Sequence, residues 1–108
     1  MHYNLVTLFP EWFDSPLSSS LMEKAREAGI VSFSFANPRD KSTDRHHHVD
    51  DRPYGGGPGM VLMLEPVYLM IQELKAEREY DEVIYMSPDG EILNQNISNE
   101  LSLKENII

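Results

Sequence analysis

The chain has 108 residues, no cysteine and a net charge of −9 at pH 7. This length fits one small domain with a modest core, and the acidic balance argues against a surface that coats nucleic acid unselectively, since such surfaces are basic. The lack of cysteine excludes disulfides and thiolate chemistry, and the sequence shows neither a signal-peptide pattern nor an apolar run approaching the ~20 residues that span a bilayer.

The first predicted element is a strand at residues 3–9, a short and nearly continuous apolar run that is typical of a buried strand in a parallel sheet. Pro10 should end this strand and open a helical turn. Trp12 and Phe13 follow within that turn, and we expect both aromatic side chains to pack in the core.

An amphipathic helix is predicted after this turn, with an apolar face formed by Leu17, Leu21, Ala25 and Ala28. Ser20 and Glu23 have the spacing of a capping box at its start, and Gly29 is well placed to end it. Residues 30–35 then alternate between apolar and serine side chains. This alternation predicts a strand that lies near the edge of the sheet.

The second half of the chain predicts two further pairs of a helix and a strand. Pro66 suits the first turn of a helix whose buried face comprises Val67, Met70, Ile71 and Leu74. An apolar strand at residues 82–86 should end in a turn at 87–90, since Ser-Pro-Asp-Gly is a strong turn signal. A short helix at 96–103 and the start of a strand at 105–108 complete the pattern.

The resulting order, β-α-β-loop-α-β-α-β, predicts an α/β fold with a parallel sheet and flanking helices. Ligands bind to such sheets at the carboxyl ends of the strands. Both the long loop after Phe35 and the turn after Met86 leave from such ends. We therefore expect the two segments to share one functional edge.

Residues 44–60, DRHHHVDDRPYGGGPGM, form a charged and glycine-rich stretch without helical or strand periodicity. Long loops of this kind are typical of binding loops, lids or disordered segments. The glycines would let an anion approach the backbone, but the Lys-Ser/Thr pair of a Walker A phosphate loop is missing. Adjacent histidines on an extended chain point to opposite sides, which argues against a metal site.

RNA recognition suits this composition better than a phosphate loop, a metal site or a plain linker. Arg45, His46 and Arg52 can contact phosphates, Tyr54 can stack on a base, and Asp50 can accept hydrogen bonds from the Watson–Crick edge of guanine. The mixture of charges favours a selective reader, because unselective affinity comes from summed phosphate contacts.

Three stretches resemble the bacterial tRNA (guanine-N1)-methyltransferase family, trefoil-knot enzymes of the SPOUT type. They are LFP at 8–10, PRD at 38–40 followed by the 44–60 stretch, and YMSPDG at 85–90. The VDDRPYGGGPGM portion is long and highly specific to that family. The resemblance covers all 108 residues in order and spacing. It does not cover the second half of the family's sequence, which we expect to follow Ile108.

The resemblance implies transfer of a methyl group from S-adenosylmethionine to N1 of the guanosine that lies immediately 3′ of the tRNA anticodon. It implies a cytoplasmic homodimer with shared active sites and tRNA as partner. We expect no DNA or membrane partner, and we assign no metal ligand among the site residues. The cofactor-binding residues that it implies are Tyr85, Met86, Ser87, Pro88 and Asp89. The substrate-binding residues that it implies, within a mobile loop at 38–60, are Arg45, His46, Asp50, Arg52, Pro58 and Gly59, to which the stacking argument adds Tyr54.

Methylation at N1 of guanine requires a base that removes the N1 proton and a cation that stabilises the charge developing on O6. In the family these two groups lie in the second half of the sequence, so we assign no catalytic residue here and treat Asp50 as an auxiliary acceptor. Residues 1–108 are then an incomplete methyltransferase domain, inactive alone. The alternatives are a non-catalytic RNA- or nucleotide-binding module, and an incomplete domain that associates through an unpaired strand edge.

Overall fold

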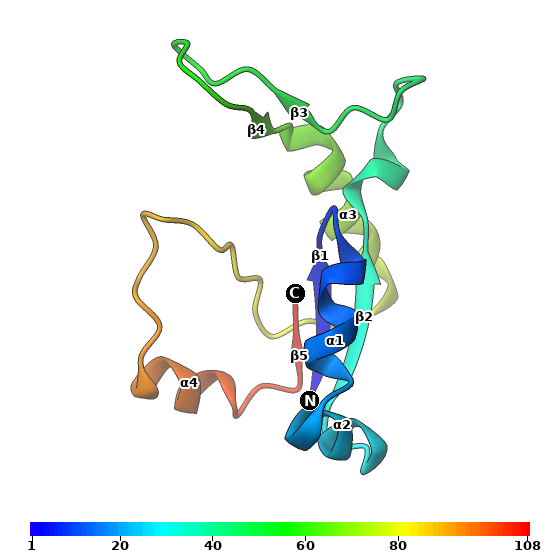
Figure 1. Cartoon of the computed structure of the whole chain (residues 1–108), viewed down its shortest axis with the longest axis vertical. Helices are drawn as coiled ribbons and strands as arrows, with labels where there is room; N and C mark the ends of the chain where they lie inside the picture. Colours follow the sequence, from blue (N-terminus) through cyan, green and yellow to red (C-terminus); the bar gives the residue numbers. More distant parts are fainter.

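A computed structural model describes residues 1–108, which build helices around a small parallel sheet (Figure 1). The sheet has the order β2-β1-β5, formed by β1 (His2–Val6), β2 (Ser32–Ala36) and β5 (Asn106–Ile107). Both strand pairs are parallel, and Tyr3 of β1 lies opposite Phe33 on one side and Ile107 on the other. The predicted α/β class, the parallel sheet and the edge position of the second strand are confirmed.

The predicted strand at 82–86 is wrong as a full strand, because only Glu82 forms a bridge, to Ile107. The N–H of Ile108 donates to the Glu82 carbonyl (3.0 Å), and the N–H of Ile84 donates to the Ile108 carbonyl (2.8 Å). The pairing reaches no further along this segment. Strand hydrogen bonds need a neighbour, and β5 offers one only as far as Ile108.

Helix α3 (Leu64–Glu77) covers one face of the sheet. Met70 and Leu74 are buried and form a core cluster with Ala36, against which the partly buried Val6, Tyr80 and Ile108 pack. The prediction of Met70 and Leu74 as buried is confirmed, whereas Val67 and Ile71 are only half-buried. Pro66 lies in the first turn of the helix, as predicted, and is itself buried.

The opposite face of the sheet meets two short helical elements, η1 (Pro10–Phe13) and α1 (Asp14–Leu17). The Phe13 ring lies against Phe35 of β2 with a centroid distance of 5.7 Å, so its packing role is confirmed. The prediction for Trp12 is wrong, since this residue is 73% exposed. Its indole instead stacks on the Phe9 ring at 5.1 Å, on the surface.

Helix α2 (Ser20–Glu27) ends as predicted at Gly29, whose φ is 71°. The N–H groups of Gly29 and Ile30 donate to the carbonyls of Arg26 and Ala25, the pattern of a Schellman cap. The predicted capping box is wrong: the N-cap is Ser19, so the Ser20 hydroxyl is one position too late to cap. The predicted apolar face is also not buried, because Leu21 is exposed.

The remaining elements are η2 (Pro38–Lys41), a hairpin of β3 (Asp50–Asp51) and β4 (Val61–Leu62), and α4 (Gln95–Leu101). The predicted helix at 96–103 is confirmed within two residues, and the Asn94 side chain caps it by accepting from the Ile97 N–H at 3.1 Å. None of the helices has the length and apolarity to cross a membrane.

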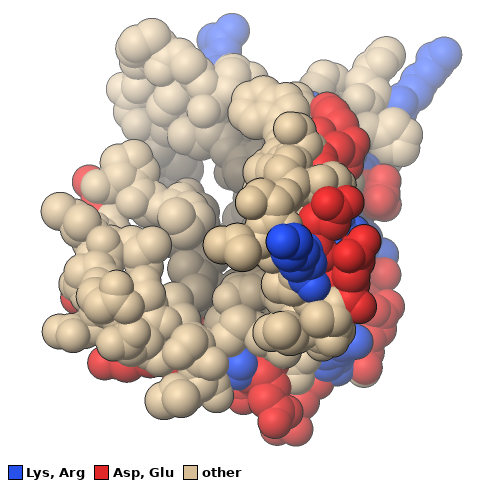
Figure 2. Space-filling model, turned by 60° about the horizontal axis from the view of Figure 1, so that its bottom comes forward, with Lys and Arg blue, Asp and Glu red and all other residues tan.

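The chain buries little of itself: 8 of its 108 residues are buried. It exposes 8421 Å² of surface, against roughly 6,100 Å² for a compact monomer of its mass, 12.4 kDa. Figure 2 shows the acidic side chains gathered along one side of the molecule and a broad, largely uncharged surface on the other. The excess of exposed surface means that much apolar area lacks a covering layer.

Candidate functional site

The long loop begins with a tightly tied segment, residues 39–49, which we call the loop root. Its first turn is capped by the Asn37 side chain, which accepts from the Arg39 N–H at 3.0 Å. The Arg39 guanidinium donates to the His47 carbonyl (3.3 Å), and the Ser42 hydroxyl donates to the His48 carbonyl (2.8 Å). Lys41 pairs with Glu73 of α3 and so joins this segment to the sheet-covering helix.

Asp44 lies at the centre of the loop root. Its carboxylate accepts a hydrogen bond from the His46 N–H at 2.7 Å and pairs with the His48 ring. The backbone bond from His46, followed by the bond to His48, lowers the pKa of Asp44. The rings of His46 and His48 also meet edge to face at 5.7 Å. Asp and His side chains were predicted to contact RNA, but those of Asp44, His46 and His48 contact one another or the backbone of the loop root.

The loop root ends at Val49, whose side chain is fully buried, with 0% exposure. The hairpin that follows, residues 50–62, pairs Asp50 with Leu62 and Asp51 with Val61. The Val49 carbonyl accepts from the Met63 N–H at 2.6 Å and closes the hairpin at its base. Residues 44–60 were predicted to lack regular structure, and this short hairpin corrects that prediction.

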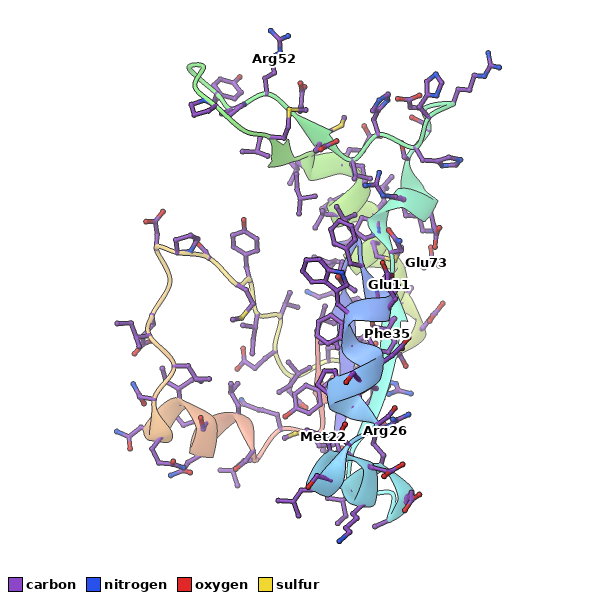
Figure 3. The ribbon with its side chains drawn as sticks, viewed as in Figure 1. Glu11, Met22, Arg26, Phe35, Arg52 and Glu73 are labelled. Atoms are coloured by element: carbon purple, nitrogen blue, oxygen red, sulfur yellow. The ribbon has the colours of Figure 1, made fainter.

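The hairpin projects its predicted substrate-binding residues into solvent. Arg52 points away from the sheet (Figure 3), and Tyr54 is fully exposed. Gly59 has a φ of 88°, a conformation in which any side chain would be strained. Asp50 is half-buried and its carboxylate makes no hydrogen bond or ion pair within the chain, so it is free to accept one from a ligand.

The seven predicted substrate residues thus fall into two groups. Arg45 and His46 lie on the loop root, whereas the others lie on or near the hairpin; these are Asp50, Arg52, Tyr54, Pro58 and Gly59. All are exposed except Asp50. The structure describes no group of three His, Cys, Asp or Glu residues placed to hold a metal ion.

The predicted cofactor residues, Tyr85–Asp89, lie within residues 83–93, which we call the arching segment because it bows away from the sheet (Figure 1). Its predicted turn is confirmed: the Gly90 N–H donates to the Ser87 carbonyl at 3.1 Å, and the Asp89 N–H donates to the Ser87 hydroxyl at 3.2 Å. Tyr85 and Met86 are 82% and 83% exposed. The structure keeps this segment apart from the 44–60 loop, so the expected shared edge is not assembled within this chain.

Sequence reasoning missed three residues that hold these segments. Asp44 and Arg39 tie the loop root, and Asp81 anchors the start of the arching segment by accepting from the N–H groups of Glu105 (2.8 Å) and Asn106 (2.9 Å). These backbone bonds lower the pKa of Asp81. For Asp44 the sequence did carry a signal, because Asp often accepts from the N–H two residues later.

Comparison with known proteins gives matches over the whole chain. The family model described as tRNA (Guanine-1)-methyltransferase TrmD matches residues 1–108. The tRNA (guanine-N(1)-)-methyltransferase of Flavobacterium johnsoniae is 49% identical over 108 residues, which are 100% of this chain and 48% of the relative. The corresponding protein of Oleidesulfovibrio alaskensis is 49% identical over 107 residues, 99% of this chain and 24% of the relative.

Among solved structures, the tRNA (m1G37) methyltransferase from Aquifex aeolicus matches with a TM-score of 0.86 and 33% identity. The match covers 99% of this chain and 48% of that chain. The chain therefore spans about half the length of this structure and of the Flavobacterium relative.

Proposed function

Because this chain belongs to the tRNA (guanine-1)-methyltransferase family, we propose that the whole protein methylates N1 of the guanosine immediately 3′ of a tRNA anticodon, with S-adenosylmethionine as methyl donor. The observation that carries the proposal is the unbroken match over residues 1–108 to relatives named as tRNA (guanine-N(1)-)-methyltransferases. The chain spans about half of the Flavobacterium relative, so the activity is proposed for the whole protein.

The hairpin is the proposed tRNA-binding part of this chain. Arg52 supplies a charge for a phosphate, and the exposed Tyr54 ring offers a face on which an unpaired base can stack. Asp50 offers a free carboxylate that can accept from the N1–H or the amino group of guanine. His46 and Arg45 on the loop root extend this surface, and Pro58 and Gly59 shape the strand that returns.

The arching segment is the proposed wall of the cofactor site. The exposed Tyr85 and Met86 side chains provide apolar surface for the adenosyl group. A Cβ at Gly90 would lie 3.1 Å from the Ser87 carbonyl, so the turn is narrow. These residues fit S-adenosylmethionine in chemistry but provide only one side of a site. When bound, the cofactor supplies an electrophilic methyl group on a sulfonium sulfur.

The rest of the active site is proposed to come from residues outside this chain, in a homodimer in the cytoplasm. The large exposed surface supports this, because Tyr85, Met86 and Ile92 of the arching segment and Leu103, just after α4, are uncovered. No base for the N1 proton is assigned within residues 1–108, and Asp50 serves as an auxiliary acceptor. Residues 1–108 alone should bind S-adenosylmethionine weakly and transfer no methyl group.

The test is transfer of a radiolabelled methyl group by the full-length protein to two tRNA transcripts. One carries guanosine 3′ of the anticodon and the matched control carries adenosine there. We expect label in the first transcript only, and none from residues 1–108. Absence of label in the first transcript would overturn the proposal. Binding of the tRNA without methylation would instead favour a non-catalytic RNA-binding module.

A further inference from the structure

We propose that Asp44 is a positioning residue for tRNA binding, because it fixes the loop root and thereby the direction in which the hairpin presents Arg52 and Tyr54. This inference rests on the proposed function of the hairpin. Asp44 touches neither proposed ligand group itself, so its effect on binding would pass through the backbone that it holds.

The carboxylate of Asp44 is fully engaged within the loop root. One oxygen accepts from the His46 N–H at 2.7 Å, and the other pairs with the His48 ring. The two bonds draw a stretch of five residues into a closed turn. An ionised carboxylate accepts hydrogen bonds only and repels a phosphate, which separates Asp44 from the contact residues Arg45 and Arg52.

A short chain of contacts leads from Asp44 to the hairpin. His48 is held on its ring by Asp44 and on its carbonyl by the Ser42 hydroxyl, at 2.8 Å. The next residue is the fully buried Val49, and its carbonyl accepts from Met63 at the hairpin base. A shift of His48 would therefore be passed to both strands of the hairpin, because Val49 and Met63 directly flank them.

The turn held by Asp44 contains one residue with an unfavourable backbone conformation. His47 has a φ of 52°, in the left-handed region that side chains other than glycine rarely adopt. Its ring and carbonyl both contact Arg39, at 3.3 Å each. A cavity of about 70 Å³ lies between the loop root and the start of α3, lined in part by Asp44, His48 and Met63. This space would let the turn relax once the Asp44 bonds are lost.

The experiment compares Asp44→Ala and Asp44→Asn with Asp40→Asn in the full-length protein. Asp40 is exposed, lies on the same segment and accepts no side-chain hydrogen bond, so it controls for the loss of one charge. We expect Asp44→Ala to raise the Kd and KM for tRNA by up to roughly 10-fold, the scale of losing one charge-assisted hydrogen bond and one solvent-exposed ion pair. The kcat at saturating tRNA and the affinity for S-adenosylmethionine should stay at the wild-type values. The tRNA Kd of Asp44→Asn, which keeps an acceptor for the His46 N–H, should lie between those of the wild type and Asp44→Ala.

Further outcomes decide the proposal. Adding His48→Gln to Asp44→Ala should weaken binding no further, because the two side chains act as one unit. A tRNA Kd equal to that of Asp40→Asn, or a fall in kcat with an unchanged KM, would overturn the role of Asp44. Filter binding of tRNA measures the effect without methyl transfer, so an inactive wild type that still binds tRNA would overturn the enzymatic proposal and leave this test decisive. Should Asp44→Ala fail to fold, Asp44→Asn and His48→Gln supply the same comparison.

Discussion

The loop at residues 39–62 and the arching segment at 83–93 are both proposed to meet ligands, but they are held differently. The loop is tied by side-chain bonds to its own backbone and stands on the fully buried Val49. The arching segment has one turn of its own, and its Tyr85 and Met86 side chains are exposed. The loop can therefore hold its shape within this chain, whereas the arching segment needs another surface to fix it.

This difference follows from where hydrogen bonds and apolar contacts are available. A loop rich in Asp and Arg, with Asn37 just before it and Ser42 within it, can satisfy its backbone locally, without a neighbouring strand. A run such as EVIYM at 82–86 carries apolar side chains and must pair with a strand and pack to be satisfied. The chain provides that pairing only up to Ile84.

The largest expected effect comes from Val49→Asp, which removes the support of the loop. A charge at this fully buried position would have no partner and should cost on the order of 3–5 kcal/mol of folding free energy. We expect a lowered Tm and rapid proteolysis within residues 39–62. Val61→Asp is the matched control, since Val61 is 48% exposed and lies on the paired strand. Equal stability of the two variants would contradict the account of the loop.

The second-largest expected effect is a loss of stability of the full-length protein when Tyr85→Ser and Met86→Ser are combined in the arching segment. In residues 1–108 both side chains are exposed, so the Tm should not change. In the full-length protein, burial of each side chain against another surface would be worth about 1.5–3 kcal/mol, and its loss should lower the Tm. The affinity for S-adenosylmethionine should fall as well. A full-length double variant with wild-type Tm and wild-type cofactor affinity would refute the need for a covering surface.

Arg52→Ala should weaken tRNA binding in the full-length protein by roughly tenfold or less, the effect of losing one exposed phosphate contact. The Tm should stay unchanged, because the side chain points into solvent. The loss should shrink as salt rises, since the contact is electrostatic. Lys75→Ala is the control, an equal loss of charge at an exposed position of α3. Unchanged tRNA affinity of Arg52→Ala with a lowered Tm would assign Arg52 a structural role instead.

Gly59→Ala should also impair tRNA binding or turnover more than folding.

Sequence patterns predicted those parts of the fold whose partners lie within the chain. The apolar run of β1, the alternation of β2 and the helical period of α3 were informative because their apolar residues pack on each other, as Met70 and Leu74 do on Ala36. The same reasoning misplaced Trp12 and Leu21, which are apolar but exposed here. An apolar period indicates that a residue can be buried, but it does not indicate which surface covers it.

For the candidate site, the sequence located both segments but not their internal structure. The Ser87–Gly90 turn was predictable because Pro, Asp and Gly set its backbone locally. The ion pair of Asp44 with His48 could not be predicted, since it depends on the left-handed backbone of His47, which lies between them. In a loop without periodicity, no sequence pattern indicates such a bond. The seven proposed substrate-binding residues remain a prediction, which tRNA-binding measurements on their variants can test.

The smallest expected effect is a loss of stability in acid, which arises at the base of the arching segment. The Asp81 carboxylate accepts from the N–H groups of Glu105 and Asn106, and these bonds lower its pKa below the ordinary 3.8. A carboxyl whose pKa is lower in the folded state binds fewer protons there than in the unfolded chain. Its stabilising contribution is therefore complete above pH 3.8 and is lost as the pH falls through the lower, folded value.

Asp81→Asn keeps an oxygen acceptor for the two N–H groups but cannot titrate. We expect a slightly lower Tm at pH 7 and a shallower fall in Tm as the pH falls below 3.8 than in the wild type. Asp44→Asn is the informative comparison, because the pKa of Asp44 is also lowered, by bonds within the loop root. If the arching segment is held to β5 at its base by Asp81, only Asp81→Asn should speed hydrogen exchange at Glu105 and Asn106. Equal exchange in both variants would show that the bridge at Glu82 suffices to hold that segment, and the contrast between the two regions would then begin beyond Ile84.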